Sequence, residues 1–339
     1  MARENVPLIV THVIARVLRN GVQTRLGKYR NWPDERLLIS DPVALAEERT
    51  SKLRRIFDNA GRDAWDGPRL FREAMEKHGG IQLSQEKRLA LAQPVTDLMW
   101  GELAAWLVSA ELAERIDDVD AKLAATAQVF DEARHFYTLR DYLAAMHVPV
   151  PKIDPYMGVA VRRLLAARDL VVKLFAMQIL AEGAAVAIFR FLIKNEVEPV
   201  LCELLPFFER DESRHVGFGV LYLPQVLREL PVRRLKRIRN TTWGIGDLFG
   251  ATQLRNAQRY QALGCEPRDL IRSADKMLFE LGEKIGPIPG TDLRFFNVNP
   301  TGDESYEKVL DVIAPAKDQE PSFWARRSKN VIDLGARVL

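Results

Sequence analysis

Cysteine is nearly absent from this chain of 339 residues, which contains only Cys202 and Cys265. Two cysteines supply neither a disulfide framework nor a thiolate-rich metal site, which favours a reducing compartment. The N-terminus carries Glu4 and has no apolar stretch before a small-residue cleavage site, so we expect no signal peptide. The longest apolar region, 158–193, is interrupted by arginines and by Glu182, which predicts no transmembrane segment. These absences together predict a cytoplasmic protein.

An excess of charge of one sign is also missing. The 49 lysines and arginines nearly balance 46 aspartates and glutamates, leaving a net charge of +3. Because no nucleic-acid-binding motif accompanies this balance, we expect no DNA or RNA partner. One local exception is the basic run Arg-Arg-Leu-Lys-Arg-Ile-Arg at 233–239. Such runs are usually solvated helix faces. The functional alternatives are that the run docks an acidic carrier protein or reductase, or that it binds a membrane surface.

Histidine is scarce too, and two of the five histidines belong to a repeated string. The pattern Asp-Glu-x-Arg-His occupies 131–135 and recurs 80 residues later at 211–215. Thirty residues before the glutamate of each string, another glutamate lies in an apolar run, at Glu102 and at Glu182. This Glu…Glu-x-x-His pattern, present twice, has the ligand count and spacing of a carboxylate-bridged two-metal site in a four-helix bundle.

The spacing has a simple helical explanation. Residues at i and i+3 lie on one face of a helix, so Glu132 and His135 can hold one ion together. The second string can do the same, and the two isolated glutamates add one carboxylate each. An oxygen-rich set without thiolates favours iron or manganese over structural zinc, so we predict two Fe ions or an Fe/Mn pair. The predicted metal ligands, whose carboxylates are also the predicted catalytic groups, are Glu102, Glu132, His135, Glu182, Glu212 and His215.

Residues beside the ligands strengthen this interpretation. A metal-bound histidine usually donates its other ring N–H to a carboxylate. We expect the aspartate of each string to serve the histidine of the other, and the arginine three residues later to hold that aspartate. The alternative is a metal-free network of buried ion pairs, which burial of so many acids disfavours. The predicted supporting residues are Asp131, paired with His215, Asp211, paired with His135, Arg134 and Arg214.

Apolar periodicity and turn signals predict an all-α fold, because no alternation typical of strands occurs. The pattern predicts helices over 84–115, from a cap at Asp117 or Asp118 to before Pro149, over 158–194 and over 199–224, and further helices over 231–263 and 267–285. The identical offset between the two halves indicates an internal duplication. We predict an N-terminal helical extension at 1–83, a four-helix di-metal bundle at 84–226, and C-terminal helices with a loop-rich tail packed on the bundle at 227–339.

In these residues the chain resembles the ferritin-like di-iron carboxylate proteins, whose signature is Glu…Glu-x-x-His repeated on four helices. The Asp-Glu-x-Arg-His form is similar to hydroxylase subunits of bacterial multicomponent monooxygenases, acyl-carrier-protein desaturases and R2-like oxidases. The likeness covers roughly 85–225. It implies a ferritin-like four-helix bundle with additional helices and the six ligands given above.

The resemblance implies an O2-activating di-iron oxidoreductase. We expect a hydroxylase or other oxygenase for an apolar or amphipathic substrate, supplied with electrons by an external ferredoxin or flavoprotein reductase. One alternative is a soluble fatty-acyl desaturase with a carrier-bound substrate. Another, from a different class, is a non-catalytic helical partner subunit or an iron-binding protein, although six retained ligands disfavour a degenerate subunit. Hydroxylation, desaturation and N-oxygenation all stay open, as does the oligomeric state, for which a homodimer is one option.

Departures from the family pattern argue against a radical subunit and against the ether crosslink. The tyrosine that follows the first histidine by one turn in ribonucleotide reductase radical subunits is replaced by Leu139. The valine and tyrosine of the ether crosslink in R2-like oxidases are replaced by Ala104 and Met177. Monooxygenases and desaturases often carry a threonine one turn after the third glutamate, where this chain has Ala185 and Val186.

Small and apolar residues one turn from the ligands predict a substrate pocket beside the metals. Ordinary core packing is the alternative, because any bundle core contains the same residue types. The predicted pocket residues are Ala105, Trp106, Gln178, Ile179, Val186, Phe189 and Phe208.

Overall fold

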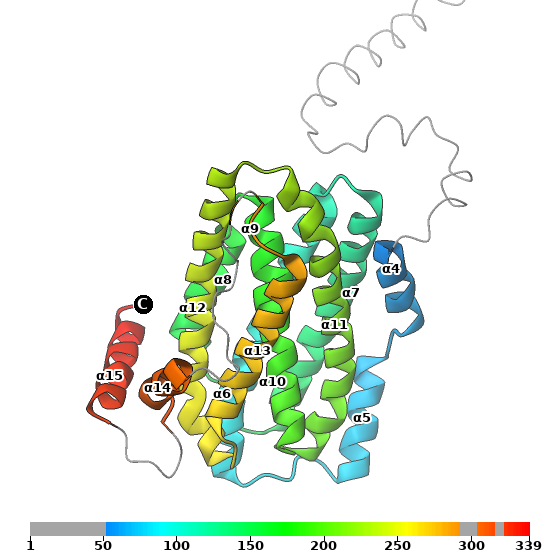
Figure 1. Cartoon of the computed structure of the whole chain (residues 1–339). Coiled ribbons are helices and arrows are strands. Elements are labelled where there is room, and N and C mark those ends of the chain that lie inside the picture. The colour runs from blue at the N-terminus through cyan, green and yellow to red at the C-terminus, as the bar shows by residue number, and fades with distance from the viewer. Residues whose placement is uncertain (1–51, 290, 292–303, 316–321) are drawn as a thin grey trace, which may run out of the picture.

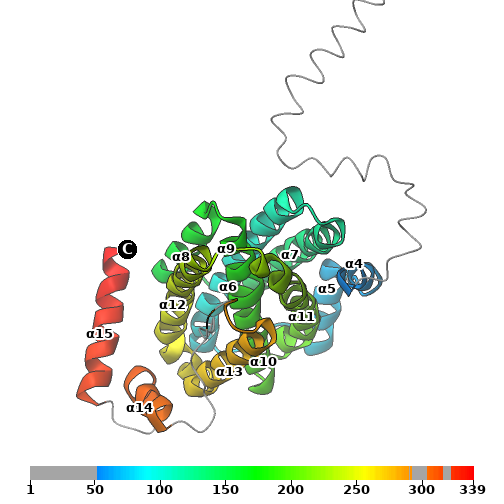
Figure 2. The same ribbon diagram turned by 45° about the horizontal axis from the view of Figure 1, so that its top comes forward.

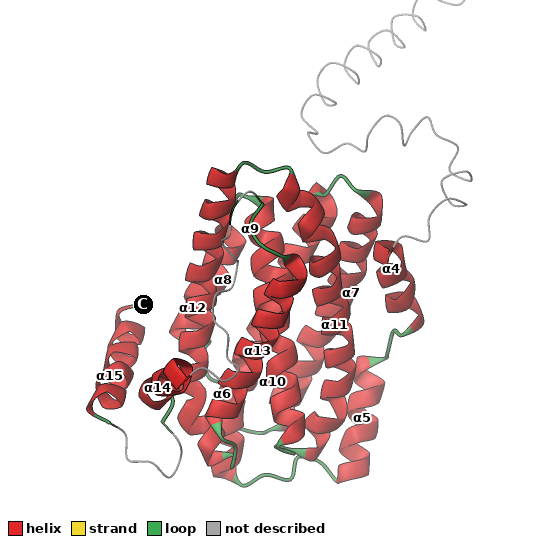
Figure 3. Cartoon of the chain, in the orientation of Figure 1, coloured by secondary structure: helices red, strands yellow, loops and turns green. Residues whose placement is uncertain are grey.

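The structure is a computed structural model that describes residues 52–289, 291, 304–315 and 322–339. The first 51 residues of the predicted N-terminal extension lie outside this described part. The described residues form helices joined by turns and loops, with no β-strand among them (Figure 3). The predicted all-α class is therefore confirmed.

Four long helical segments form the central bundle (Figure 1). Two of them make an antiparallel pair joined by a short turn, and the other two make a second such pair. The third segment changes from α-helix to π-helix and back without a loop. The segments are α6 (Gln85–Arg115), α7 (Val119–Ala145), α9 (Leu170–Phe175) continuing through η1 (Ala176–Ala181) into α10 (Glu182–Lys194), and α11 (Pro199–Arg228).

Side-chain caps fix where these helices begin. Ser84 accepts a hydrogen bond from the backbone N–H of Lys87 at the start of α6, and Asp118 accepts one from Ala121 at the start of α7. Such caps satisfy backbone donors that have no partner inside the helix, and each stabilises its helix by about 1 kcal/mol.

The predicted continuous helix over 158–194 is wrong in one respect. The chain instead forms α8 (Pro155–Ala166) and leaves helical geometry at 167–169 before α9 begins. Asp169 makes the restart favourable, because its carboxylate accepts the backbone N–H of Val171. Apolar periodicity alone did not reveal this break, since both helices present apolar faces.

Further helices cover the bundle on two sides (Figure 2). On one side, α4 (Lys52–Arg62) and α5 (Gly67–His78) pack against α7 and α11. On the other, α12 (Val232–Ala262) packs against α6 and α8, and α13 (Pro267–Ile285) packs against α10. Beyond them lie α14 (Glu304–Ile313) and α15 (Phe323–Val338).

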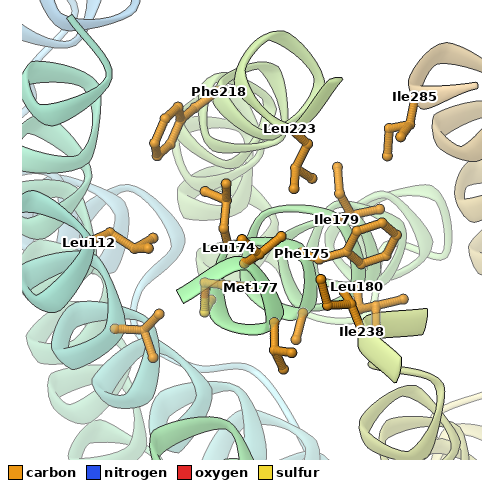
Figure 4. Close-up of a cluster of buried hydrophobic side chains, with 14 of the residues drawn as sticks. Leu112, Leu174, Phe175, Met177, Ile179, Leu180, Phe218, Leu223, Ile238 and Ile285 are labelled. Carbon is orange, nitrogen blue, oxygen red and sulfur yellow. The ribbon is translucent and has the colours of Figure 1, made fainter. Parts of the chain in front are cut away.

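The core has two apolar layers separated by a polar one. One layer contains Leu112, Phe175 and Phe218 near one end of the bundle (Figure 4). The other contains Tyr142 and Phe208 towards the opposite end. Along each bundle segment, the predicted metal ligands lie between residues of the two layers. The fold therefore places buried acids at the middle of the bundle, away from water.

The segment Leu170–Lys194 is long and apolar enough to cross a membrane, judged by length and composition alone. In the structure, 83% of its most apolar window is buried inside the protein. A central helix of a bundle meets the same criteria, and the neighbouring helices account for the apolar side chains of this one.

Candidate metal centre

The structure brings all six predicted metal ligands together at the middle of the bundle. Each of the four bundle segments contributes one glutamate, and α7 and α11 each add a histidine one turn later. None of the six side chains is more than 5% exposed. The ligands are Glu102 from α6, Glu132 and His135 from α7, Glu182 from α10, and Glu212 and His215 from α11.

These residues form two overlapping groups. In each group, four donor atoms lie within 4.8 Å of one another. Glu132 and Glu212 belong to both groups, whereas Glu102 and His135 belong to the first and Glu182 and His215 to the second. Two neighbouring cation positions that share two carboxylates are the arrangement expected of a carboxylate-bridged metal pair.

Both imidazoles turn one nitrogen towards the shared carboxylates. The Nδ1 atom of His135 lies 2.9 Å from Oε1 of Glu212 and 3.4 Å from a carboxylate oxygen of Glu102. The Nδ1 atom of His215 lies 2.7 Å from the other oxygen of Glu212 and 3.2 Å from Glu132. Each histidine can thus join two carboxylates in holding one ion.

The opposite nitrogen of each ring faces an aspartate across the bundle. Nε2 of His135 is 3.3 Å from Asp211, and Nε2 of His215 is 3.2 Å from Asp131. These are the two pairs expected from the sequence. A carboxylate at Nε2 fixes the ring orientation and leaves the Nδ1 lone pair directed at a metal ion.

Both arginines of the repeated strings lie behind these aspartates. Arg134 donates to Asp131 on its own helix and to Asp211 at 2.8 Å. Arg214 donates to Asp211 at 2.6 Å and to Asp131 at 3.1 Å. Each arginine therefore ties α7 to α11, and the placement of the four supporting residues follows the expectation.

Sequence reasoning did not identify Trp65, which completes this layer from the segment between α4 and α5. Its indole N–H donates to Asp211 at 2.7 Å, and the guanidinium of Arg134 lies over its ring at 4.7 Å. A tryptophan 146 residues before its aspartate gives no local signal in the sequence. Its partly buried ring lies beside the Asp211 carboxylate, which is itself fully buried, and exclusion of water there strengthens the hydrogen bonds.

A second missed residue is Gln128, one turn before Glu132 on α7. Its side-chain amide donates to Glu132 at 2.9 Å and to Glu182 at 2.6 Å. Gln178, predicted as a pocket residue, instead donates to the Gln128 carbonyl at 2.7 Å. The four-residue spacing between Gln128 and Glu132 is the signal that could have revealed this contact.

The charge of the site has no internal balance. Six carboxylates are buried here, and two guanidinium groups contact them, which leaves four negative charges in excess when both imidazoles are neutral. Oε2 of Glu132, Oε1 of Glu212 and Nδ1 of His135 also make no hydrogen bond. Since uncompensated buried charge is strongly unfavourable, these donors fit two divalent metal ions.

Without metal, protons supply the missing positive charge. Burial and the charge of Glu212 raise the pKa of Glu102 and of Glu182 well above the ordinary range. Burial opposes protonation of the two imidazoles, but the charge of Glu212 outweighs it, and the pKa of each rises well above its usual value. Four groups of the metal-free site therefore hold protons that metal ions displace.

A cavity of about 300 Å³ adjoins the site on the side covered by α12 and α13. Glu102 and Glu182 reach its wall, and most of the remaining lining is apolar. Small residues border it beside both glutamates, among them Gly101 and Ala181. The cavity wall thus includes one ligand of each metal group.

Only one of the seven predicted pocket residues, Ala105, lines this cavity. Phe208 stacks on His135 with ring centroids 4.3 Å apart, and Phe189 packs edge-on against Phe208. A Cβ on Gly219 would lie only 2.5 Å from Cβ of Gln178 and 3.0 Å from Ile179, so α11 closes against η1 there. Trp106 is partly exposed, and Val186 is buried away from the cavity. Six of the seven predicted residues thus lie outside this cavity, which adjoins the ligands under α12 and α13, and their role in a substrate pocket stays a prediction.

No family model matches the sequence, and no curated protein matches it. Solved structures do match its fold. A variant of an R2-like ligand-binding oxidase with an aerobically reconstituted Mn/Fe cofactor aligns with a TM-score of 0.56 at 17% identity, over 70% of this chain and 95% of that one. Another variant, with an Fe/Fe cofactor, aligns with a TM-score of 0.55 at 17% identity over the same shares. The chain therefore has the ferritin-like fold, as the sequence resemblance implied.

Proposed function

We propose that this protein is a di-metal oxidoreductase that activates dioxygen, and that it oxygenates an apolar or amphipathic substrate. The observation that carries the proposal is the buried excess of four negative charges around two donor groups sharing Glu132 and Glu212. An Fe/Fe or Mn/Fe pair suits this set of four carboxylates and two imidazoles. The R2-like ligand-binding oxidases that share the fold were reconstituted with these same metal pairs, which supports the choice.

Each group of residues has a defined task in this proposal. Glu102 and His135 would hold one ion, Glu182 and His215 the other, and the two shared glutamates both. When bound, the metal pair supplies the electrons that activate dioxygen, which no side chain of the site can do. Asp131 and Asp211 keep both imidazoles oriented, and the apolar layers exclude water from the reacting centre.

The cavity supports an oxygenase over a protein that only stores or binds iron. An iron-binding role requires the ligands but no space for an organic molecule beside them. Here a cavity of about 300 Å³ reaches Glu102 and Glu182, at the lower end of the size range for small-molecule sites. Its apolar wall suits a substrate with a C–H bond to oxidise.

Metal content and optical spectroscopy test the proposal. We expect protein grown with iron to hold about two metal ions per chain and, after reduction, to change its visible spectrum on exposure to dioxygen. A folded protein without metal, or one whose reduced form does not react with dioxygen, would refute the proposal. The Glu198→Gln variant is a matched control, because Glu198 is buried at the N-cap of α11 and accepts a hydrogen bond from Tyr142 rather than contacting the metal ligands.

The electrons require an external donor, and the basic run 233–239 offers a surface for it. Arg233, Lys236 and Arg237 are exposed at the start of α12 and border a shallow recess. Arg234 is instead paired with Asp169 at 3.0 Å, and Leu235 is buried. We propose that the three exposed cations attract the acidic face of a ferredoxin or flavoprotein reductase.

Charge reversal tests this surface. The Arg237→Glu variant should slow donor-dependent reduction of the metal site by roughly tenfold at low salt, because steering by charge acts mainly on association rates. Metal content and chemical reduction by dithionite should stay unchanged. The matched control is Arg326→Glu on α15, an exposed arginine far along the chain from this run. Equal donor-dependent rates for wild type and Arg237→Glu would show that the run is an ordinary solvated helix face and does not bind the donor.

A further inference from the structure

The polar groups that line the cavity are all acidic or neutral. Among the described residues at its wall, no lysine, arginine or histidine occurs. Two carboxylates outside the metal site reach the wall, Asp97 from α6 and Asp275 from α13. The remaining polar lining consists of amides and a tyrosine, together with two of the glutamates assigned to metal: Glu102, Glu182, Gln253, Asn256 and Tyr260.

Asp97 is the more deeply buried of the two carboxylates, with 4% of its surface exposed. One oxygen accepts the amide N–H of Gln93 at 3.0 Å and the backbone N–H of Asp154 at 2.8 Å. The other accepts a single hydrogen bond, from Asn256 at 3.1 Å. Since a carboxylate oxygen can accept two hydrogen bonds, this second oxygen has capacity for a donor from the cavity.

Asp97 has no ion-pair partner within the described part of the chain. Arg255 lies nearby in the same polar network, but its guanidinium pairs with Asp154 and Asp333. Asp154 also adds negative charge near Asp97, and burial raises the pKa of Asp97 to about 6. At pH 7.5, above this pKa, Asp97 is mostly anionic and has no cation to balance it at the cavity wall, which is unfavourable unless a ligand supplies the charge.

Asp275 differs in its surroundings. The hydroxyl of Tyr306, from α14, donates to Asp275 at 2.7 Å, and Asp275 is only partly buried. Its charge is thus closer to solvent and already has a donor from the helix that covers this side. Of the two acids, Asp97 presents the more fixed and less balanced carboxylate.

The cavity also disfavours an anionic ligand. A carboxylate group within it would meet Asp97 and Asp275, the two wall carboxylates outside the metal site, and no described wall residue would offset their repulsion. A protonated amine would be attracted instead. Its N–H group would donate to the Asp97 oxygen that accepts only one hydrogen bond, while its apolar part fills the rest of the cavity.

We propose that the cavity binds a small apolar amine, with the protonated nitrogen held by Asp97 and the hydrocarbon part directed along α6 towards Glu102. Asp97 and Glu102 are five residues apart on this helix, which corresponds to about 7.5 Å along its axis. The metal site would thus face carbon atoms of the ligand rather than its nitrogen. That the bound amine is a substrate rests on the proposed function. Whether the cavity binds an amine can be tested separately.

Binding of three eight-carbon probes tests the inference: octylamine, octanol and octanoate. Titration calorimetry on metal-loaded wild-type protein at pH 7.5 should give the tightest binding for octylamine and the weakest for octanoate. A charge-assisted hydrogen bond in a buried site corresponds to roughly 10- to 100-fold in affinity between the amine and the alcohol. Equal binding of octanol and octylamine, or preferred binding of octanoate, would overturn the inference without any variant.

Two variants locate the charge that matters. Asp97→Asn should reduce octylamine affinity by roughly tenfold or more and leave octanol affinity within about threefold, since only the cation loses its partner. Asp275→Asn removes the same charge from the opposite wall and should change octylamine affinity less than about threefold. An amine preference that survives Asp97→Asn, or that disappears instead in Asp275→Asn, would refute the assignment to Asp97.

Metal content measured on the same samples separates this inference from the proposed function. About two metal ions per chain with no preference for the amine would leave the di-metal function in place and refute the amine site. An amine preference in protein that holds no metal would support the amine site and refute the di-metal function. Helix content from circular dichroism would show that each variant is folded.

Discussion

Replacing Glu212 by glutamine is expected to remove both metal ions, whereas replacing Glu102 is expected to remove one. Glu212 contributes to both donor groups, with one oxygen 2.9 Å from His135 and the other 2.7 Å from His215. Glu102 contributes only to the group that contains His135. Neutral glutamine has nearly the same shape as glutamate but binds a divalent cation far more weakly. Substitution of a shared glutamate therefore weakens the binding of both ions, whereas substitution of an unshared one weakens the binding of a single ion.

The expected size of the effect is large. Loss even of a residue that only supports a metal ligand typically lowers metal affinity by roughly 10- to 100-fold, and a direct ligand should matter at least as much. After dialysis against a weak chelator, Glu212→Gln should retain close to no metal and Glu102→Gln about one ion per chain. Elemental analysis of both variants beside wild type measures this directly.

Two symmetry-related variants sharpen the comparison. Glu132→Gln should behave like Glu212→Gln, because Glu132 also belongs to both groups, and Glu182→Gln should behave like Glu102→Gln. The Glu198→Gln control, at a buried glutamate outside the groups, should keep about two ions. Equal metal loss in all four site variants would contradict the division into shared and unshared ligands.

The ligand set could be predicted from the sequence because helical geometry links spacing to position. Glu132 and His135 are three residues apart, so any helix through them puts both on one face. The repeat at 211–215 then implied a facing partner, and the cross-bundle pairing of Asp131 with His215 followed from the same symmetry. Contacts that follow from spacing along one helix and from the repeat can therefore be predicted without the tertiary structure.

Contacts that depend on the packing of distant segments could not be predicted in this way. Trp65 reaches Asp211 only because α4 and α5 cover α7 and α11. The cavity depends on how α12 and α13 lie over α6 and α10, and no periodicity within those helices specifies their location. The break at 167–169 was missed because a capping aspartate in an apolar stretch is a weaker signal than the periodicity around it.

The second large effect is a loss of folding stability of the metal-free protein as the pH rises above the mildly acidic range. Glu102, Glu182, His135 and His215 have raised pKa values in the folded chain, and all four return to ordinary values on unfolding. The folded state therefore binds more protons than the unfolded state above about pH 5, and its stability falls as the pH rises through the folded pKa values. Each extra proton corresponds to about 1.4 kcal/mol per pH unit.

Other acids of the site act in the opposite direction at low pH. The charges of the imidazoles lower the pKa of Glu212 despite its burial, and hydrogen bonds from His135 and the charge of Arg214 do the same for Asp211. Their contribution to stability is present above the ordinary carboxyl range and is lost as the pH falls. The metal-free protein should thus be most stable in mildly acidic solution.

Metal binding should abolish the loss of stability at higher pH. Two divalent ions displace the protons from the two glutamates and both imidazoles, so loading at pH 7 should release up to about four protons per chain. Calorimetric melting between pH 5.5 and 8.5 should show a Tm that falls by several degrees in metal-free protein and stays nearly constant in loaded protein. A pH indicator in weakly buffered solution measures the released protons.

A double variant distinguishes this account from a general effect of alkaline pH. Glu102→Gln with Glu182→Gln replaces two protonated carboxyl groups by neutral amides of nearly the same shape. Its metal-free form should lose stability less steeply with rising pH, because two of the four titrating groups are gone. If the double variant and wild type show the same slope, the excess negative charge is not balanced by protons on these glutamates. The charge argument for two metal ions would then lose its basis, since it requires that this buried excess be neutralised within the site.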